Sequence, residues 1–327
     1  MKTTYDFIDS NKRKTIFLIA LFPLSLAVMT YASLFVFLYI NGSTGQSQNQ
    51  ISVVSVLQNI NIYFLYIFAV IIVLSSIWTL ISFYSGHNFI LSLVNSRQAD
   101  QTTDKEIIRL VENIAITAGL PMPQVYIMDT PALNAFATGR NPENAYVVLT
   151  TGIIEKLEKS ELEGVIAHEM SHIGNSDTKL MMIIILVIGF FTLAGSLLMR
   201  VSVRGRGGKN KGALIFLIAG LILYIYGTLI APIIRLAVSR RREYQADAGA
   251  ALITRNPQGL ISALKKISSN PRVESFDGKE IMSAMCIESP LKEGINIFDS
   301  LHGLFSTHPP VADRIKALEQ MDGISAD

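Results

Sequence analysis

No charged side chain occurs between Thr15 and Ser96, and this gap constrains the chain more than any other feature of its sequence. Two apolar runs lie within the gap, at about residues 15–40 and 60–83. Each is longer than the roughly 20 residues that a helix needs to cross a bilayer. We therefore expect two transmembrane helices, which form an N-terminal membrane anchor over residues 1–96.

The basic residues that precede the first run are also a feature of signal peptides. This run is too long for a signal peptide, and no cleavage pattern of small residues follows it, so we expect a retained anchor. The chain is 50% hydrophobic and only 17% charged, which excludes an ordinary soluble protein. A net charge of +2 without a long basic stripe predicts no nucleic-acid partner. The chain has 1 cysteine, which excludes a cysteine-based zinc site.

Two later apolar runs, Leu180–Met199 and Ala213–Ile234, predict a hydrophobic hairpin at about residues 180–234. The loop between them, RVSVRGRGGKNKG, is strongly basic and should resist translocation. The sequence therefore leaves open whether the hairpin spans the bilayer. Basic residues near the other ends of the runs form the larger group, which places the termini and the 85–179 segment in the cytoplasm.

The remaining segments carry nearly all of the charge, and we expect them to form one domain over residues 97–327 that the hairpin interrupts. Hydrophobic periodicity and turn residues predict a small β-sheet with strands at 124–128, 134–138 and 145–149. They also predict helices at 103–119, 151–157, 161–174, about 235–253, 257–267 and 311–321. A capping box of Ser160 and Glu163 should start the 161–174 helix. The expected fold class is a mainly α membrane protein with an α+β domain.

The predicted 161–174 helix carries the pattern H-E-x-x-H, from His168 to His172. Four residues make about one helical turn, so both imidazoles face the same way and suit a tetrahedral zinc ion. Glu169 can take a proton from a water molecule that the metal activates. The alternative is an exposed charged helix face, which would leave these side chains without a common role.

A catalytic zinc ion needs a third protein ligand. Glu243 is the better candidate, and Asp247, one helical turn later, can accept the outer N–H of a ligand histidine. The alternative for these two acids is a solvated helix face beside the arginine run. His87, next to the second apolar run, and His302, in an unpatterned stretch, are weaker candidates.

Four segments occur in the order PALNAFATG, HEMSHIGNSD, SRRREYQAD and STHPPVADRI, and together they resemble the membrane zinc metalloproteases of the HtpX family. That family is related to the CaaX prenyl proteases, and the resemblance covers most of the chain. It implies a zincin-like (gluzincin) protease domain with one Zn²⁺ held by His168, His172 and Glu243. Glu169 would then be the catalytic base, and Asp247 would support a ligand.

The same resemblance implies a multi-pass enzyme of the cell (inner) membrane with its active site facing the cytoplasm. Such an enzyme cleaves damaged or misassembled membrane proteins and unfolded polypeptides, as part of protein quality control in the stress response. The expected partners are these substrates and the lipid bilayer. The sequence names no individual substrate and no oligomeric state.

Asn134, Ala135 and His308 each have a functional interpretation and a purely structural one. Asn134 and Ala135 begin a predicted strand, and in similar zinc proteases such an edge strand pairs with the extended substrate. The alternative is a core strand. His308 can donate a hydrogen bond to the developing oxyanion, or it simply precedes the last helix beside two prolines. Arg314 in that helix can pair with a nearby carboxylate and is given no catalytic role.

The sequence also has to be compared with two functions other than proteolysis, those of a chaperone or adaptor and of a transporter. A membrane-anchored chaperone or adaptor would hold a purely structural zinc ion, which usually has four protein ligands, whereas the sequence offers three good ones. A transporter should carry ionisable residues at mid-depth in its membrane segments. The four apolar runs contain none, so the sequence favours a protease.

Overall fold

The fold is known from a computed structural model, which describes residues 4–43, 53–204, 213, 216–227, 240–268, 286–287 and 309–321. These residues are mainly helical, and four short strands form one mixed sheet, so the predicted fold class is confirmed. The chain divides into two compact units. One comprises residues 1–14, 84–185 and 232–327, and the other comprises residues 15–83 and 186–231.

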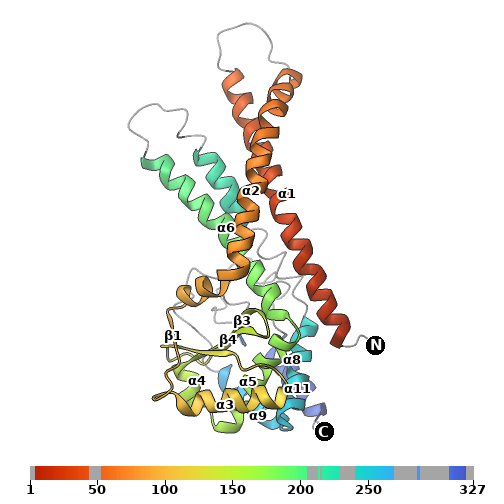
Figure 1. Ribbon diagram of the computed structural model, residues 1–327, viewed down its shortest axis with the longest axis vertical. Coiled ribbons are helices and arrows are strands. Elements are labelled where there is room, and N and C mark those ends of the chain that lie inside the picture. The colour runs from red at the N-terminus through yellow and green to blue at the C-terminus, as the bar shows by residue number, and fades with distance from the viewer. Residues whose placement is uncertain are drawn as a thin grey trace. The chain divides into compact units, whose positions relative to one another are not determined.

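Three long helices carry the apolar segments, and they are α1 (Thr4–Ser43), α2 (Val53–Leu93) and α6 (Asp177–Arg204) (Figure 1). Each contains a stretch that is long and apolar enough to cross a membrane. The two predicted N-terminal helices are therefore present. A shorter apolar helix covers 216–227, while most of the rest of the predicted second arm of the hairpin lies outside the described residues.

The sheet has the strand order β1-β2-β4-β3, with bounds β1 (Ser96–Gln98), β2 (Gln124–Met128), β3 (Ala135–Asn141) and β4 (Asn144–Thr150). β2 and β4 are parallel, and the other two pairs are antiparallel. Among the described strands, β3 lies at one edge. The three longer strands were predicted, but β1 was missed because three residues are too few to show an alternating pattern.

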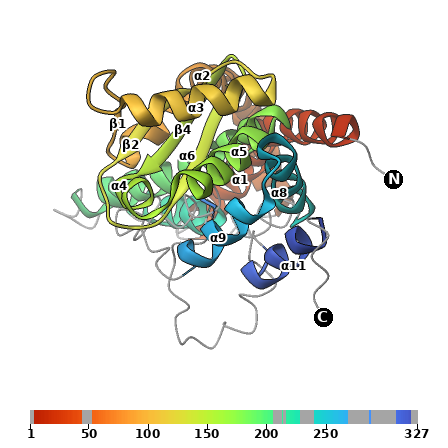
Figure 2. The ribbon, with the colours of Figure 1, turned by 90° about the horizontal axis from the view of Figure 1, so that it is seen from below.

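Among the described residues, six further helices surround the sheet or complete the same unit, and they are α3 (Lys105–Ala118), α4 (Thr151–Lys156), α5 (Lys159–Gly174), α8 (Arg240–Thr254), α9 (Pro257–Ile267) and α11 (Val311–Met321). Helix α5 is central to them. It packs against β3 and β4 on one side, and α3, α8 and α9 also contact it (Figure 2).

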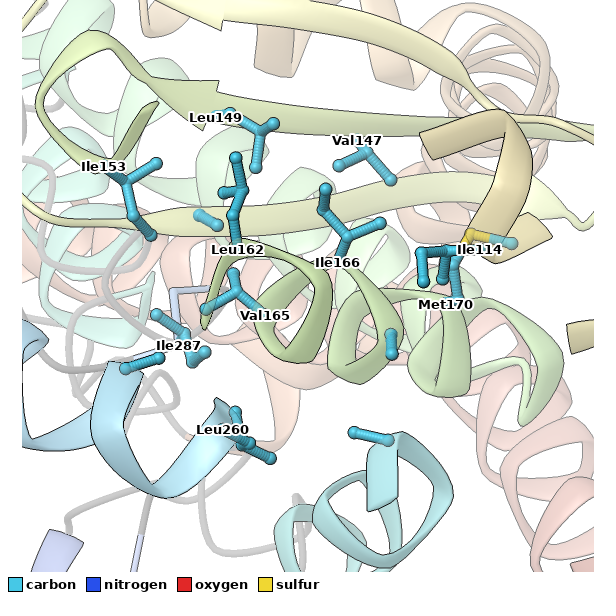
Figure 3. Close-up of a cluster of buried hydrophobic side chains, with 14 of the residues drawn as sticks. Ile114, Val147, Leu149, Ile153, Leu162, Val165, Ile166, Met170, Leu260 and Ile287 are labelled. Carbon is cyan, nitrogen blue, oxygen red and sulfur yellow. The ribbon is translucent and has the colours of Figure 1, made fainter. Parts of the chain in front are cut away.

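Helix α5 is buried on almost every side (Figure 3). Its apolar core residues include Leu162, Val165, Ile166 and Met170. Val147 and Leu149 of β4 lie on one side of them, and Leu260 of α9 lies on the other (Figure 3). Polar groups on such a helix need partners, because an unpaired buried polar group is costly. His168 and Glu169, at 0% and 1% exposed, are the most deeply buried polar residues of this helix.

The start of α5 differs from the sequence prediction. The helix begins at Lys159, with Glu158 as the N-cap residue. The Oε2 atom of Glu161 accepts a hydrogen bond from the backbone N–H of Glu158 at 2.8 Å. The predicted capping box of Ser160 and Glu163 is therefore wrong by two positions, because an acidic residue already occupies the corresponding place one half-turn earlier.

Two glycines allow the helices around α5 to approach it closely. A Cβ atom at Gly164 would lie 2.8 Å from the backbone nitrogen of Leu260 in α9. A Cβ atom at Gly249 of α8 would collide with the side chain of Ser171. Small residues at these contacts bring α8 and α9 against the helix that carries the H-E-x-x-H pattern.

Candidate metal centre

The two histidines of the pattern project from α5 toward a carboxylate of α8. Their Nε2 atoms are 3.2 Å apart. The carboxylate of Glu243 places Oε2 3.8 Å from Nε2 of His168 and Oε1 3.7 Å from Nε2 of His172. Tetrahedral zinc with bonds of about 2.0–2.1 Å separates neighbouring ligand atoms by about 3.3 Å. One ligand atom from each of the three side chains lies within 4.8 Å of the others, so their spacing fits a single metal ion.

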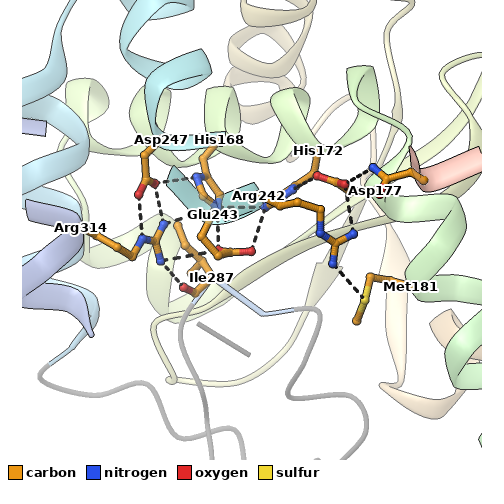
Figure 4. Close-up of polar contacts among 10 residues, drawn as sticks. His168, His172, Asp177, Met181, Arg242, Glu243, Asp247, Ile287 and Arg314 are labelled. Carbon is orange, nitrogen blue, oxygen red and sulfur yellow. Dashed lines mark hydrogen bonds and ion pairs between the residues drawn. The ribbon is translucent and has the colours of Figure 1, made fainter. Parts of the chain in front are cut away.

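On one side of this centre, a carboxylate and an arginine stand behind His168 (Figure 4). Nδ1 of His168 lies 3.0 Å from Oδ1 of Asp247, one turn after Glu243 on α8. Arg314 of α11 donates to Asp247 from Nε at 2.9 Å and from Nη2 at 2.7 Å. All three side chains are 1% exposed or less. Because Asp247 faces the outer nitrogen, Nε2 of His168 faces Glu243, and Nη2 of Arg314 lies 3.5 Å from the same Nε2 atom.

On the other side, His172 has a similar arrangement (Figure 4). Its Nδ1 forms a hydrogen bond of 2.8 Å with Oδ2 of Asp177, the first residue of α6. Oδ1 of Asp177 accepts hydrogen bonds from Nη1 of Arg242 at 3.1 Å and from Nδ2 of Asn11 at 2.6 Å. Each candidate ligand histidine thus has a carboxylate at Nδ1 and an arginine on that carboxylate.

The surroundings of the two imidazoles shift their pKa values in opposite directions. Burial lowers the pKa of His168 to about 4, so this imidazole is neutral at pH 7, as a metal ligand must be. Burial also opposes protonation of His172, but its hydrogen bond to Asp177 and the charge of Glu243 outweigh burial and raise its pKa to about 9. These acidic groups therefore favour a positive charge at His172, which is a proton in the metal-free protein, and a bound metal cation would take the place of that proton.

Glu169 lies next to His168 on α5 and is 1% exposed. Its negative charge contributes to the raised pKa of His172 and, after burial, to the raised pKa of the Cys286 thiol. A buried carboxylate beside the candidate ligands has the place that a general base for an attacking water molecule needs.

Residues 101–322 match the model of Peptidase family M48. The chain belongs to this family. The predicted resemblance to HtpX proteases is also confirmed by relatives of nearly the same length. A Protease HtpX homolog of Bacteroides fragilis is 39% identical over 317 residues, which cover 95% of this chain and 96% of that relative.

Other similar proteins include a Protease HtpX homolog of Streptococcus uberis. It is 37% identical over 325 residues, which cover 97% of this chain and 99% of that relative. The crystal structure of S. mikatae Ste24p matches with a TM-score of 0.44 and 18% identity, over 94% of this chain and 67% of that chain. The M48 family and the HtpX relatives make this chain an HtpX-like membrane protease, and its substrates are polypeptides.

The predicted substrate-binding residues lie at the start of the edge strand of this M48 protease. Asn134 and Ala135 are both 1% exposed. Oδ1 of Asn134 accepts a hydrogen bond from the N–H of Ala135 at 3.0 Å. The carbonyl oxygen of Ala135 accepts one from the N–H of Ile287, also at 3.0 Å. Both backbone groups of Ala135 thus have partners in the chain, and the role of this residue pair stays a prediction.

Among the described residues, the one further histidine, His87, is not part of the metal centre. His87 stacks on Tyr146, with ring centroids 4.3 Å apart, which accounts for its position without a metal. His302 and His308 lie outside the described residues, so the predicted role of His308 in binding the oxyanion stays a prediction.

Sequence reasoning did not find the groups behind His172. Asp177 stands at the end of the HEMSHIGNSD segment, and an acid five residues after a ligand histidine is a signal that could have been used. Arg242 precedes Glu243 within a run of arginines, and nothing in that run indicates its contact with Asp177. Asn11 gave no signal, since its contact with Asp177 joins residues that are 166 positions apart. The predicted pairing of Arg314 with a carboxylate is present, and its partner is Asp247.

Proposed function

We propose that this M48 protease is a zinc-dependent endopeptidase. His168, His172 and Glu243 are the protein ligands of one Zn²⁺ ion, and Glu169 is the general base. The main support is that two Nε2 atoms and one carboxylate converge, while carboxylates face both outer nitrogens. Zinc accepts such a set of two imidazoles and one carboxylate, and three protein ligands leave a position for water or substrate.

The reaction is hydrolysis of a peptide bond, and this chain supplies the proton transfer. When bound, the metal polarises the substrate carbonyl and lowers the pKa of water. Glu169 takes one proton from the attacking water as its oxygen adds to the carbonyl carbon. Glu169 then gives that proton to the leaving nitrogen, and the C–N bond breaks. The carboxylate is regenerated, so the base is ready for another substrate.

An extended polypeptide can add to the edge of β3 as a further strand. Asn134 and Ala135 contribute to this edge, and His308 donates a hydrogen bond to the developing oxyanion. Because the N–H of Ile287 already binds the carbonyl of Ala135, a substrate either displaces that contact or pairs further along β3.

Residues 1–96 form the membrane anchor, and residues 97–327, with the apolar insertion at about 180–234, form the protease domain. The active site faces the cytoplasm at the cell (inner) membrane. The substrates are damaged or misassembled membrane proteins and unfolded polypeptides, which are removed in protein quality control. The HtpX relatives and the larger group of basic residues support this assignment. A chaperone with a structural zinc ion is not favoured, because such sites usually have four protein ligands.

Glu169→Gln tests the proposal, because it retains the shape of the base but removes its basicity. The full chain, purified in detergent, should keep one zinc ion and cleave casein about 10²–10⁴-fold more slowly. Glu163→Gln, which changes a more exposed acid of the same helix, should cleave like the unmodified chain. Chelation should abolish cleavage and added zinc should restore it. Cleavage at the unmodified rate by Glu169→Gln would remove Glu169 from the mechanism.

A further inference from the structure

Asp177 receives hydrogen bonds from three separate parts of the chain. Oδ2 accepts the Nδ1–H of His172 at 2.8 Å, since an ionised carboxylate can only accept. Oδ1 accepts from Arg242 at 3.1 Å and from Asn11 at 2.6 Å. The aspartate is 3% exposed, so these partners, rather than bulk water, determine where its carboxylate lies.

The position of this carboxylate determines what His172 can do. Because Nδ1 is directed at Asp177, Nε2 of His172 is turned toward Glu243 and toward Nε2 of His168. The side chain of His172 is 16% exposed, compared with 1% for that of His168. Packing therefore restrains His172 less than His168, and the orientation of His172 depends more strongly on its hydrogen bond.

Asn11 is the distant member of this group, because it lies in α1, before the apolar stretch becomes continuous. It is 3% exposed, although the next two residues, Lys12 and Arg13, are exposed. Its Nδ2 atom donates to Oδ1 of Asp177 and, at 3.1 Å, to the carbonyl oxygen of Asn175. One amide group therefore holds both the carboxylate and the turn between α5 and α6.

We infer that Asn11 is a positioning residue of the metal centre, which acts on His172 through Asp177. The inference rests on the metal site proposed above. Arg242 is adjacent to Glu243, so one turn of α8 provides both a ligand and a contact to Asp177. Asn11 provides a second contact to the same oxygen from the start of α1. The first turns of α1 thus complete the metal centre as well as leading into an apolar segment.

Asn11→Leu removes the amide and tests this inference on the full chain in detergent. The readout is the zinc Kd, measured by competition with a chromogenic chelator. Loss of a partner behind a ligand histidine typically weakens metal binding about 10–100-fold. We expect about tenfold for Asn11→Leu and up to about 100-fold for Asp177→Asn. Asn11→Ser, a milder change that keeps a short donor, should give an intermediate Kd. The absorption spectrum of the Co²⁺-substituted protein should shift with Asn11→Leu.

Thr15→Val is the matched control, because it removes another buried polar group one turn later on α1. It should leave the zinc Kd unchanged. In the Asp177→Asn background, Asn11→Leu should weaken zinc binding by less than about twofold further, because the two residues act in series. Unfolding of the metal-free variants separates weaker binding from loss of folding.

An unchanged zinc Kd and Co²⁺ spectrum in Asn11→Leu would overturn the inference, while the proposed function would stand. Equal weakening by Thr15→Val would also overturn it, because the effect would then belong to α1 in general. If the unmodified chain bound no metal, the proposed function would fail and the inference would fail with it.

Discussion

On each side of the metal centre, a carboxylate lies at Nδ1 of one histidine and orients it. Different parts of the chain supply these two carboxylates. Behind His168 stand Asp247 of α8 and Arg314 of α11, and the side chains of all three are 1% exposed or less. Behind His172 stands Asp177, at the start of α6, and the histidine is 16% exposed. The groups behind both histidines are buried, but His168 itself is buried as well, whereas His172 is partly exposed.

The same arrangement of a carboxylate and an arginine can therefore contribute mainly to the stability of the fold on one side and mainly to the orientation of a histidine on the other. Removing one member of a buried ion pair leaves an uncompensated charge and costs about 3–5 kcal/mol. Because the side chain of His172 is partly exposed, water can replace part of a contact that it loses. We therefore expect changes behind His168 to destabilise the fold, and changes behind His172 to weaken metal binding with a smaller loss of stability.

The largest effect is expected for the residue that both sides share. Glu243→Ala removes the only carboxylate proposed as a ligand, so zinc binding should weaken by more than the roughly 100-fold typical of a partner behind a ligand. Zinc content per chain, measured by atomic emission, checks this. Glu155→Ala, at an exposed position of α4, should keep its zinc. Full zinc occupancy in Glu243→Ala would show that Glu243 is not a ligand, and the two sides would then share no ligand.

The next largest effect separates the two sides. Arg314→Leu leaves the buried Asp247 without its strongest partner and should lower the free energy of unfolding by about 3–5 kcal/mol. Asp177→Asn should lower it by less, because the amide keeps the shape of the side chain and one oxygen that can still accept from Arg242 or Asn11. Denaturant unfolding of the metal-free variants in detergent measures both. Equal losses of stability would show that the contrast between the sides is wrong.

The smallest effect concerns the packing that both sides have in common. Gly164→Ala places a methyl group against the backbone of Leu260, and it should lower the free energy of unfolding by about 1–3 kcal/mol. The zinc Kd of the folded protein should not change, because Gly164 lies at the contact between α5 and α9. A weaker zinc Kd would indicate that general packing of α5, instead of the specific carboxylates, orients the histidines.

The sequence predicted the His168 side better than the His172 side for a physical reason. Glu243 and Asp247 lie one turn apart on one helix, and helical periodicity places them on the same face. Asp177 follows α5 after a turn in which Ser176 has a φ of 58°, and periodicity does not extend across such a turn. Asn11 approaches Asp177 only because the whole chain folds, and no local pattern carries that information.

The fold was predictable where local patterns are strong. Strand β2 and helices α9 and α11 have the predicted bounds, since alternation, Pro257 and Pro310 mark them clearly. The sequence predicts where the long helices lie, but it does not predict the residues at which they begin and end. Helix α1 begins at Thr4, well before residue 15, because apolarity marks a membrane segment and charged residues can continue the same helix.

The central claim is that two imidazoles and one carboxylate bind a single zinc ion. X-ray absorption at the zinc edge of the detergent-purified Glu169→Gln protein tests it most directly, because the spectrum counts imidazole, oxygen and sulfur ligands. We expect two imidazole ligands, with the remaining ligands all oxygen. A sulfur ligand from Cys286, or a spectrum with a single imidazole, would contradict the claim.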